Sequence, residues 1–314
     1  MYNLSVKARF LLSLALLAAL PAASSAADFF GDLAALPAFR PAPPAVPPPL
    51  RASGAAGDVS VFSLPGFLGG RRVRVYLPPG YAARPGRRYP VLYMHDGQNL
   101  FDDSTSYAGE WRVDETCEEL IRAGRIPPLI VVGVDNALAG RLDEYTPWPD
   151  PEHGGGKADA YLKALKDVLK PEIDRRYRTL KGPEDTLLAG SSLGGLVSAY
   201  AGYLYPGTWG TVIAMSPSYW WAGEKFASWM EARKKPGLKF FYQDMGTSEG
   251  SGGGEENIAG LRRVERIALA SGFAAGKDFF SLEVPGHVHS EACWAARFPR
   301  ALELAFGRRA GGPQ

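Results

Sequence analysis

A serine between two glycines is the first group in the sequence that could act as a nucleophile. Gly190–Gly194 reads GSSLG and matches G-x-S-x-G around Ser192, and Gly246–Gly250 gives a second match around Ser248. A nucleophilic serine of this kind sits on a sharp turn between a strand and a helix. A strand pattern precedes Ser192 and a helical pattern follows it, whereas a glycine-rich loop follows Ser248. We therefore predict that Ser192 is the nucleophile.

A serine hydroxyl is a weak nucleophile at neutral pH and needs an adjacent base. The chain has four histidines, and two of them, His95 and His153, precede Ser192. Hydrolases with this serine motif carry their triad in the order serine, acid, histidine. This order leaves His287 and His289. We predict His289 as the base, because it lies just before a helical segment on a loop that can lean towards the serine, and His287 as a structural residue of that loop.

The acid of such a triad should follow the strand predicted over Leu238–Met245. Asp244 belongs to the end of this strand, and Glu249 lies in the loop beyond it. A loop carboxylate reaches a histidine Nδ1 more easily, so we predict Glu249 and keep Asp244 as the alternative. The carboxylate would hold the imidazole tautomer and stabilise the imidazolium without taking the proton.

The tetrahedral intermediate of acyl transfer needs N–H donors aimed at its oxyanion. The amide of Leu193, directly after the nucleophile, is the first expected donor. The second should follow the strand Tyr89–Gly97, which favours the amide of Gln98, with Asn99 as the alternative. His153–Gly156 reads HGGG, but it lies directly before a predicted helix, so we interpret it as the loop leading into that helix.

The elements that would position these residues alternate between strands and helices. After an opening hairpin (VSVFSLPG and RRVRVYLPP), strands are predicted over Tyr89–Gly97, Leu129–Asp135, Asp185–Gly190 and within TVIAMSP, LKFFYQDMG and DFFSLEVPG. Helices are predicted over Trp111–Ala123, Ala158–Tyr177 with an interruption near Pro171, Ser192–Tyr205 and Glu291–Phe306. This alternation predicts an α/β fold, with a mostly parallel central sheet and helices on both faces. Functional residues of such sheets lie beyond the carboxyl ends of the strands.

The chain divides into four predicted segments. Residues 1–26 have two basic residues, an apolar run over Phe10–Leu20 and a small-residue stretch, which is typical of a secretory signal. That run is about half the roughly 20 residues that a membrane span needs. Residues 27–57 are rich in proline and indicate a linker, 58–307 the catalytic domain and 308–314 a C-terminal tail. We expect export to the periplasm or beyond the cell, without a membrane span after signal cleavage.

Composition excludes several classes of protein. The chain has 35 basic and 33 acidic residues, and the predicted signal carries two of the basic ones, so the mature chain is formally neutral. A nucleic-acid surface needs a clustered basic excess. Two cysteines, Cys117 and Cys293, are too few for a disulfide scaffold or a cysteine-rich zinc site. Nothing in the sequence brings them together, and we expect no metal and no cofactor.

Several motifs together resemble the "putative esterase" family, over roughly Val73 to Gly307. They are HDGQNLFD, RLDEYTPW, GSSLGGL, SPSYWW, GTSEG and HSEACWAARFPRAL, in the family's order. The family includes feruloyl and acetylxylan esterases and enterobactin-type siderophore esterases. The resemblance implies an α/β-hydrolase fold and carboxylic ester hydrolysis. It puts the family's nucleophile on Ser192, its histidine on His289, its acid on Glu249, where many relatives have Asp, and an oxyanion amide on Gln98.

Polar and aromatic residues in two loops are candidates for binding the substrate. They are Arg141, Tyr145, Trp148, Trp220 and Trp221. Arg141 could bind an acidic or hydroxyl group, or it could pair with Glu144 and simply fix its loop. The two neighbouring tryptophans could stack on a sugar or an aromatic acyl group, but aromatic residues at such positions are as often plain packing.

These features together predict an exported serine carboxylic ester hydrolase that works through an acyl-enzyme. Its expected partners are small-molecule or glycan esters, most simply acylated sugars, and not nucleic acid. Two alternatives stay open: hydrolysis of an enterobactin-type trilactone siderophore, and acyl transfer to a sugar acceptor, as in the more distant mycolyltransferases that share the fold. The sequence does not predict the acyl group, the alcohol or the oligomeric state.

Overall fold

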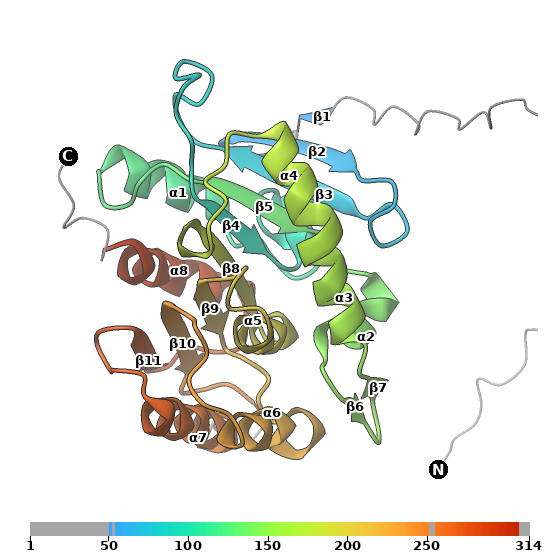
Figure 1. Cartoon of the computed structure of the whole chain (residues 1–314), viewed down its shortest axis with the longest axis vertical. Coiled ribbons are helices and arrows are strands. Elements are labelled where there is room, and N and C mark those ends of the chain that lie inside the picture. Colours follow the sequence, from blue (N-terminus) through green and yellow to red (C-terminus); the bar gives the residue numbers. More distant parts are fainter. Residues whose placement is uncertain (1–49, 52–53, 251–254, 308–314) are drawn as a thin grey trace, which may run out of the picture. The chain divides into compact units, whose positions relative to one another are not determined.

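A computed structural model of the protein describes residues 50–51, 54–250 and 255–307. A nine-stranded sheet crosses the domain in the order β1-β2-β3-β5-β4-β8-β9-β10-β11 (Figure 1). Six neighbouring strands of this sheet, β5, β4, β8, β9, β10 and β11, are parallel. β1, β2 and β3 join them through antiparallel pairs. Their bounds are Leu50–Arg51 (β1), Asp58–Ser63 (β2), Arg72–Leu77 (β3), Val91–Met94 (β4), Ile130–Val134 (β5), Thr186–Ser191 (β8), Thr211–Met215 (β9), Phe240–Gly246 (β10) and Phe279–Val284 (β11).

Helices cover both faces of this sheet. They are α1 (Val113–Arg122), α2 (Arg141–Tyr145), α3 (Ala158–Ala164), α4 (Lys170–Arg176), α5 (Leu193–Leu204), α6 (Trp221–Glu231), α7 (Glu255–Ser271) and α8 (Glu291–Phe306). A separate two-stranded ribbon pairs β6 (Pro149–Asp150) with β7 (Gly154–Gly155). The parallel sheet between two layers of helices is the architecture that the alternating pattern predicts.

The side chains of the strands alternate between two hydrophobic cores. In β4, Val91 and Tyr93 belong to the core beneath α3 and α5, whereas Leu92 and Met94 belong to the core beneath α1 and α8. Successive strand residues point to opposite faces, so a strand that is covered on both sides is apolar throughout. This is why the interior strands appear in the sequence as unbroken apolar runs.

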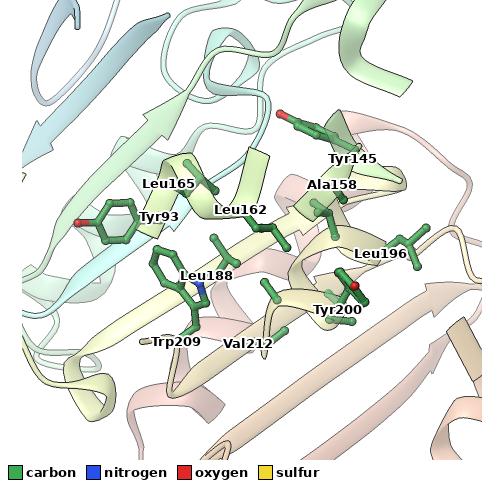
Figure 2. Close-up of a cluster of buried hydrophobic side chains, with 14 of the residues drawn as sticks. Tyr93, Tyr145, Ala158, Leu162, Leu165, Leu188, Leu196, Tyr200, Trp209 and Val212 are labelled. Atoms are coloured by element: carbon green, nitrogen blue, oxygen red, sulfur yellow. The ribbon is translucent and has the colours of Figure 1, made fainter. Parts of the chain in front are cut away.

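The core beneath α3 and α5 holds these helices against the sheet. Figure 2 shows Leu162 of α3 and Leu196 of α5 among side chains from the strands, with the Trp209 indole beside Tyr93. The Tyr93 and Trp209 rings meet edge to face at 5.2 Å. Because α5 starts directly after Ser192, its packing against the sheet also fixes the direction in which the chain leaves that serine.

The helix predicted to break near Pro171 runs on instead. A π-helical turn over Leu165–Leu169 joins α3 to α4, and Pro171 occupies the first turn of α4. Proline has no N–H, and in a helix its ring clashes with the carbonyl four residues earlier. The wider π turn directly before it accommodates both defects, so the chain stays helical from Ala158 to Arg176.

The predicted boundary of the linker shifts in the structure. β1 lies inside the proline-rich segment and pairs with β2, and the amides of Gly54 and Gly57 donate to the carboxylates of Asp102 and Asp114. The predicted signal, residues 27–49 of the linker and the tail lie outside the described residues. In the part of the chain that is described, no helix is long and apolar enough to cross a bilayer. Cys117 and Cys293 are both free thiols.

Candidate active site

Ser192 occupies the sharp turn between β8 and α5. Its backbone lies at φ 58° and ψ −125°, a conformation that non-glycine residues rarely adopt. The Ser192 amide donates to the carbonyl of Met215 at 3.0 Å, and its carbonyl accepts from the amide of Ser218 at 3.0 Å. These bonds to the end of β9 hold the turn in its strained form, which is typical of functional sites. The Ser192 Oγ lies 3.3 Å from the Ser218 Oγ.

The glycines on either side of Ser192 lie in closely packed positions. A Cβ at Gly190 would lie 2.7 Å from the carbonyl carbon of Gly194, a distance at which the backbone would have to shift. A Cβ at Gly194 would lie 3.3 Å from the Cβ of His95. The two glycines of the motif therefore fit the narrow space between β8, α5 and the end of β4.

A histidine and a carboxylate meet across two loops beyond the neighbouring strands. The Nδ1 of His289 lies 2.8 Å from the Oε2 of Glu249. Glu249 follows β10 and is 1 % exposed, whereas His289 follows β11 with a side chain that is 41 % exposed. The Trp294 ring packs edge-on against the imidazole at 4.9 Å. The carboxylate thus occupies Nδ1, and Nε2 has no hydrogen-bond partner in the part of the chain that the structure describes.

Glu249 is held by donors on its other oxygen. Its Oε1 accepts from the Ser216 hydroxyl at 2.6 Å and from the Gly246 amide at 2.7 Å, and the guanidinium of Arg297 lies 3.4 Å away. Burial alone would raise the pKa of Glu249, but the hydrogen bonds with His289, Ser216 and Gly246 outweigh it and hold the pKa below its ordinary value. The carboxylate is therefore kept charged beside the imidazole.

Asp244, the alternative acid, is placed in the sheet. It lies within β10, fully buried, and accepts from the Tyr242 hydroxyl at 2.7 Å. Burial raises the pKa of Asp244 to about 6, against the attraction of Arg297. In the described structure it is Glu249, and not Asp244, that contacts the imidazole of His289.

Ser192 and His289 line the same cleft, which has a volume of about 680 Å³. The cleft also contains Gln98, Asn99, Arg141 and Glu291. Within the described residues the Ser192 hydroxyl contacts Ser218 and forms no hydrogen bond with His289. Catalytic hydrogen bonds are often long in unliganded enzymes and tighten only around the substrate. The cleft thus brings a serine, an imidazole and a buried carboxylate to one place.

Two backbone amides are available for an oxyanion. The Leu193 amide is the first N–H of α5, and the first N–H groups of a helix have no partner inside it. The Asn99 amide is already bonded to the Asp96 carbonyl at 2.9 Å, whereas the Gln98 amide meets no acceptor among the described residues. Of the two amides considered for the second donor, the structure therefore leaves Gln98 free.

The glycine of the HDG turn lets this loop lie against the sheet. A Cβ at Gly97 would lie 2.8 Å from the backbone of Gly133 in β5. Only glycine fits this approach, so the turn that carries the Gln98 amide lies against the end of β5.

The other three histidines lie outside the cleft. His95 is buried, with its Nδ1 2.8 Å from the Tyr161 hydroxyl, and burial lowers its pKa to about 3. His153 lies 2.8 Å from Asp150, in the loop that leads towards α3. The carbonyl of His287 accepts from the Ser248 amide, as expected of a structural loop residue.

Arg141 lines the cleft, but it does not pair with Glu144 as one of the two expectations had it. It binds the carboxylate of Asp96 through two hydrogen bonds of 2.7 and 2.8 Å, whereas Glu144 binds Arg71. The residues 141–145 form the short helix α2, and this helix turns the two side chains to different neighbours. Arg141 therefore reaches the cleft with its charge largely balanced by Asp96.

The four aromatic residues predicted to bind substrate do not line the cleft. Tyr145 is fully buried, and its hydroxyl accepts from the Asp96 amide at 3.1 Å, so it supports the HDG turn from below. Trp221 is buried and donates to the Trp148 carbonyl at 2.7 Å, and Trp148 packs on the rings of α5 and α6. Trp220 is 46 % exposed and lines a separate hollow. Tyr145, Trp148 and Trp221 therefore pack into or against the core, whereas Trp220 faces the separate hollow.

Sequence reasoning missed the residues that support the histidine and its carboxylate. Ser216 accepts from the Trp294 indole at 2.9 Å and from Arg297 at 2.6 Å, and it donates to Glu249. Trp294 and Arg297 are three residues apart, so both lie on the inner face of α8. The signal in the sequence is that Arg297 shares the apolar face of the predicted helix with Trp294, Phe298 and Ala301, where a charged residue needs a partner.

Comparison with known protein families identifies relatives over most of the domain. The family model described as "Putative esterase" matches residues 68–304. The chain is 29 % identical over 250 residues to the uncharacterized protein YbbA of Bacillus subtilis, covering 76 % of this chain and 94 % of that protein.

Two larger curated relatives are named for their activities. The iron(III) enterobactin esterase of Dickeya dadantii is 27 % identical over 170 residues, which is 54 % of this chain and 35 % of that protein. The endo-1,4-beta-xylanase/feruloyl esterase of Xylanibacter ruminicola is 27 % identical over 240 residues, which is 74 % of this chain and 29 % of that protein. The chain spans only about a third of the length of these two relatives.

Solved structures share the fold. A ferulic acid esterase superposes with a TM-score of 0.62 at 15 % identity, covering 81 % of this chain and 99 % of that one. The enterobactin esterase of Shigella flexneri superposes with a TM-score of 0.60 at 18 % identity, covering 83 % of this chain and 62 % of that one. The sheet with helices on both faces is therefore the α/β-hydrolase fold.

Proposed function

Because the chain belongs to the "Putative esterase" family and is a carboxylesterase with the α/β-hydrolase fold, we propose that it works through a Ser192–His289–Glu249 triad and an acyl-enzyme. The observation that carries this proposal is the 2.8 Å contact between His289 and Glu249 at the cleft that also contains Ser192. A buried, charged carboxylate on Nδ1 keeps the proton on that nitrogen and leaves Nε2 as the base.

The proposed reaction follows from these positions. The Ser192 hydroxyl turns from Ser218 to His289, gives up its proton to Nε2 and attacks the ester carbonyl. The amides of Leu193 and Gln98 bind the oxyanion, as donors placed before the reaction begins. His289 returns the proton to the leaving alcohol, and water then clears the acyl group from Ser192 by the same steps in reverse order.

A covalent probe and a substitution test this proposal together. A fluorophosphonate should label the purified protein at Ser192, as located by mass spectrometry of peptides, and Ser192→Ala should not be labelled. Ser192→Ala should lower kcat/KM for p-nitrophenyl acetate by about 10⁴-fold or more, with an unchanged melting temperature. Hydrolysis that persists in Ser192→Ala, or an adduct on another residue, would show that the nucleophile lies elsewhere.

We propose acylated sugars or related small esters as substrates, and export as the destination. The feruloyl esterase relative supports the first, and the signal-like N-terminus supports the second. Hydrolysis of siderophore esters is the second candidate, since an enterobactin esterase is also among the relatives. Measured kcat/KM for acetylated xylo-oligosaccharides, feruloylated sugars and ferric enterobactin should be highest on the sugars. A higher value on the siderophore would establish the second candidate, and acylated acceptor in the presence of added sugar would establish transfer.

A further inference from the structure

A second hollow of about 510 Å³ adjoins the cleft on the side of the hairpin β2–β3; we refer to it as the arginine groove. Three residues, Gln98, Asn136 and Leu138, line both the cleft and the arginine groove. The two hollows therefore lie side by side and meet at these three residues.

Arginines dominate the charge of the groove. Arg71, Arg72 and Arg74 all line it. Arg71 is balanced by Glu144, which it binds through two hydrogen bonds of 2.8 and 2.7 Å. The other two guanidinium groups share one carboxylate, that of Asp135.

Asp135 is already occupied by the buried member of this pair. Arg74 binds it with Nε at 2.7 Å and Nη2 at 3.1 Å, and the Arg74 side chain is only 3 % exposed. The Arg72 Nε lies 3.6 Å from the same carboxylate, and its side chain is 58 % exposed. Among the residues that line the groove, Arg72 therefore presents the accessible guanidinium, whose planar donors suit a carboxylate.

The cleft offers an anion no comparable group among the described residues that line it. The Arg141 guanidinium is bound to Asp96, and the cleft also contains Glu291, whose pKa is raised by burial. An anion is therefore better placed beside Arg72 than in the cleft. Resting on the proposed function, we propose that the arginine groove binds a carboxylate group of the ester substrate and thereby orients the ester bond at Ser192.

Exposed apolar side chains at the two hollows indicate what connects the ester to that carboxylate. Tyr107 lines the cleft and Leu138 lines both hollows, and their side chains are 90 % and 78 % exposed. Leu138 has a positive φ of 53°, and its amide donates to the Asn136 side chain at 2.8 Å. A short aromatic or alkyl segment can lie over Leu138 while its two ends occupy the cleft and the groove.

Matched pairs of esters test the proposal. 4-Acetoxybenzoate and 4-acetoxycinnamate carry a carboxylate at two distances from the acetyl ester, and their methyl esters are neutral. For each pair, the ratio of kcat/KM for the carboxylate over kcat/KM for its methyl ester measures the preference for the anion. Arg72→Gln should lower this ratio about three- to fivefold for at least one pair, as expected for an exposed ion pair, and Arg72→Glu about tenfold. High salt should lower the wild-type ratio as well.

Arg262→Gln is the matched control, because Arg262 is 56 % exposed, is paired with Glu283 and lies on α7 outside both hollows. A ratio that stays constant in both Arg72 variants, or that falls equally in Arg262→Gln, would overturn the proposal.

Binding to Ser192→Ala gives an answer that does not depend on turnover. Calorimetry should show that 4-acetoxybenzoate or 4-acetoxycinnamate binds Ser192→Ala more tightly than its methyl ester, and that adding Arg72→Gln removes the difference. Equal binding of acid and methyl ester in both pairs would overturn the proposal even if the protein is an active esterase. A difference that depends on Arg72 would support it even if the nucleophile proves to be another residue.

Discussion

Two segments of this chain carry the same G-x-S-x-G pattern at the ends of two strands of one sheet, yet they present different residues to the site. At the end of β8 the serine itself, Ser192, lies at the cleft. At the end of β10 the serine, Ser248, is exposed, and the next residue, Glu249, is buried against His289. The same five-residue pattern thus contributes the proposed nucleophile in one place and the proposed acid in the other.

The first glycine has the same role in both segments. A Cβ at Gly190 would lie 2.7 Å from the backbone of Gly194, and a Cβ at Gly246 would lie 2.2 Å from the carbonyl oxygen of His287. In each case the chain leaves the sheet beside another backbone. The pattern therefore indicates a strand end that is packed against another backbone. The path of the chain after the serine decides which residue faces the site.

That path differs directly after the serine. α5 begins at Leu193, one residue beyond Ser192, so the first N–H groups of a helix lie beside the serine. After Ser248 the described residues up to Gly250 start no helix, and Glu249 turns inward, where its carboxylate accepts from the Gly246 amide. A helix start supplies donors for an oxyanion, whereas a loop supplies a side chain that can reach sideways to a neighbouring strand.

The largest effect that tests this comparison is expected at Glu249. Glu249→Gln keeps the shape of the side chain, but its amide nitrogen can donate to Nδ1 and favour the wrong tautomer of His289. We expect kcat/KM for p-nitrophenyl acetate to fall about 10³- to 10⁴-fold with little change in KM. Asp244→Asn is the control, because the sequence left Asp244 in the strand as the alternative acid. A loss below tenfold in Glu249→Gln, or a larger loss in Asp244→Asn, would return the role of the acid to Asp244.

The next effect concerns the glycines. Gly190→Ala places its Cβ against backbone that cannot move aside, and we expect a loss of about 3 kcal/mol in the free energy of unfolding. Among the described residues a Cβ at Gly250 would meet the end of the Asn257 side chain, so for Gly250→Ala the strain of the φ of 98° should cost about 1 kcal/mol. Urea denaturation of both variants measures this difference. Equal losses would mean that the end of β8 is no more tightly packed than the loop after β10.

The difference between the two segments also explains what the sequence could and could not predict. The strand before Ser192 and the helix after it are adjacent in sequence, and the helix over Glu291–Phe306 has the predicted bounds. Local patterns suffice for such elements, because periodicity and capping act within a few residues.

Local sequence patterns could not predict contacts between residues that are distant in the sequence. Arg141 pairs with Asp96, 45 positions away, instead of Glu144, three positions away. Tyr145 belongs to a motif that suggested substrate binding, but it is buried beneath the HDG turn. Such partners depend on which strands become neighbours in the sheet, and hydrophobic periodicity carries no information about that choice.

The contributions of Asp244 and Glu249 to stability should depend on pH in opposite directions. Burial raises the pKa of Asp244 to about 6, so the folded protein binds this proton more tightly than the unfolded chain does. The contribution of Asp244 to stability should therefore fall as the pH rises from about 4 to 6, by at most about 3 kcal/mol. The pKa of Glu249 is shifted down, so its contribution is present above the ordinary glutamate range and lost in acid.

Urea denaturation of wild type and Asp244→Asn between pH 4 and 7 isolates this contribution. The stability of the wild type relative to the variant should decline over the window from pH 4 to 6 and level off above it. A difference that stays constant, or that increases with pH, would mean that the Asp244 carboxylate is stabilised in its charged form by Arg297.

The smallest effect is expected at the second serine of the comparison. The Ser248 amide donates to the His287 carbonyl, a bond that Ser248→Ala retains, and its side chain is exposed. We expect Ser248→Ala to keep kcat/KM for p-nitrophenyl acetate within about twofold of wild type, because exposed substitutions away from special features have small effects. A large loss would mean that the loop after β10 contributes more to the site than its carboxylate. A fluorophosphonate adduct on Ser248 of the wild-type protein would place the nucleophile on this second segment.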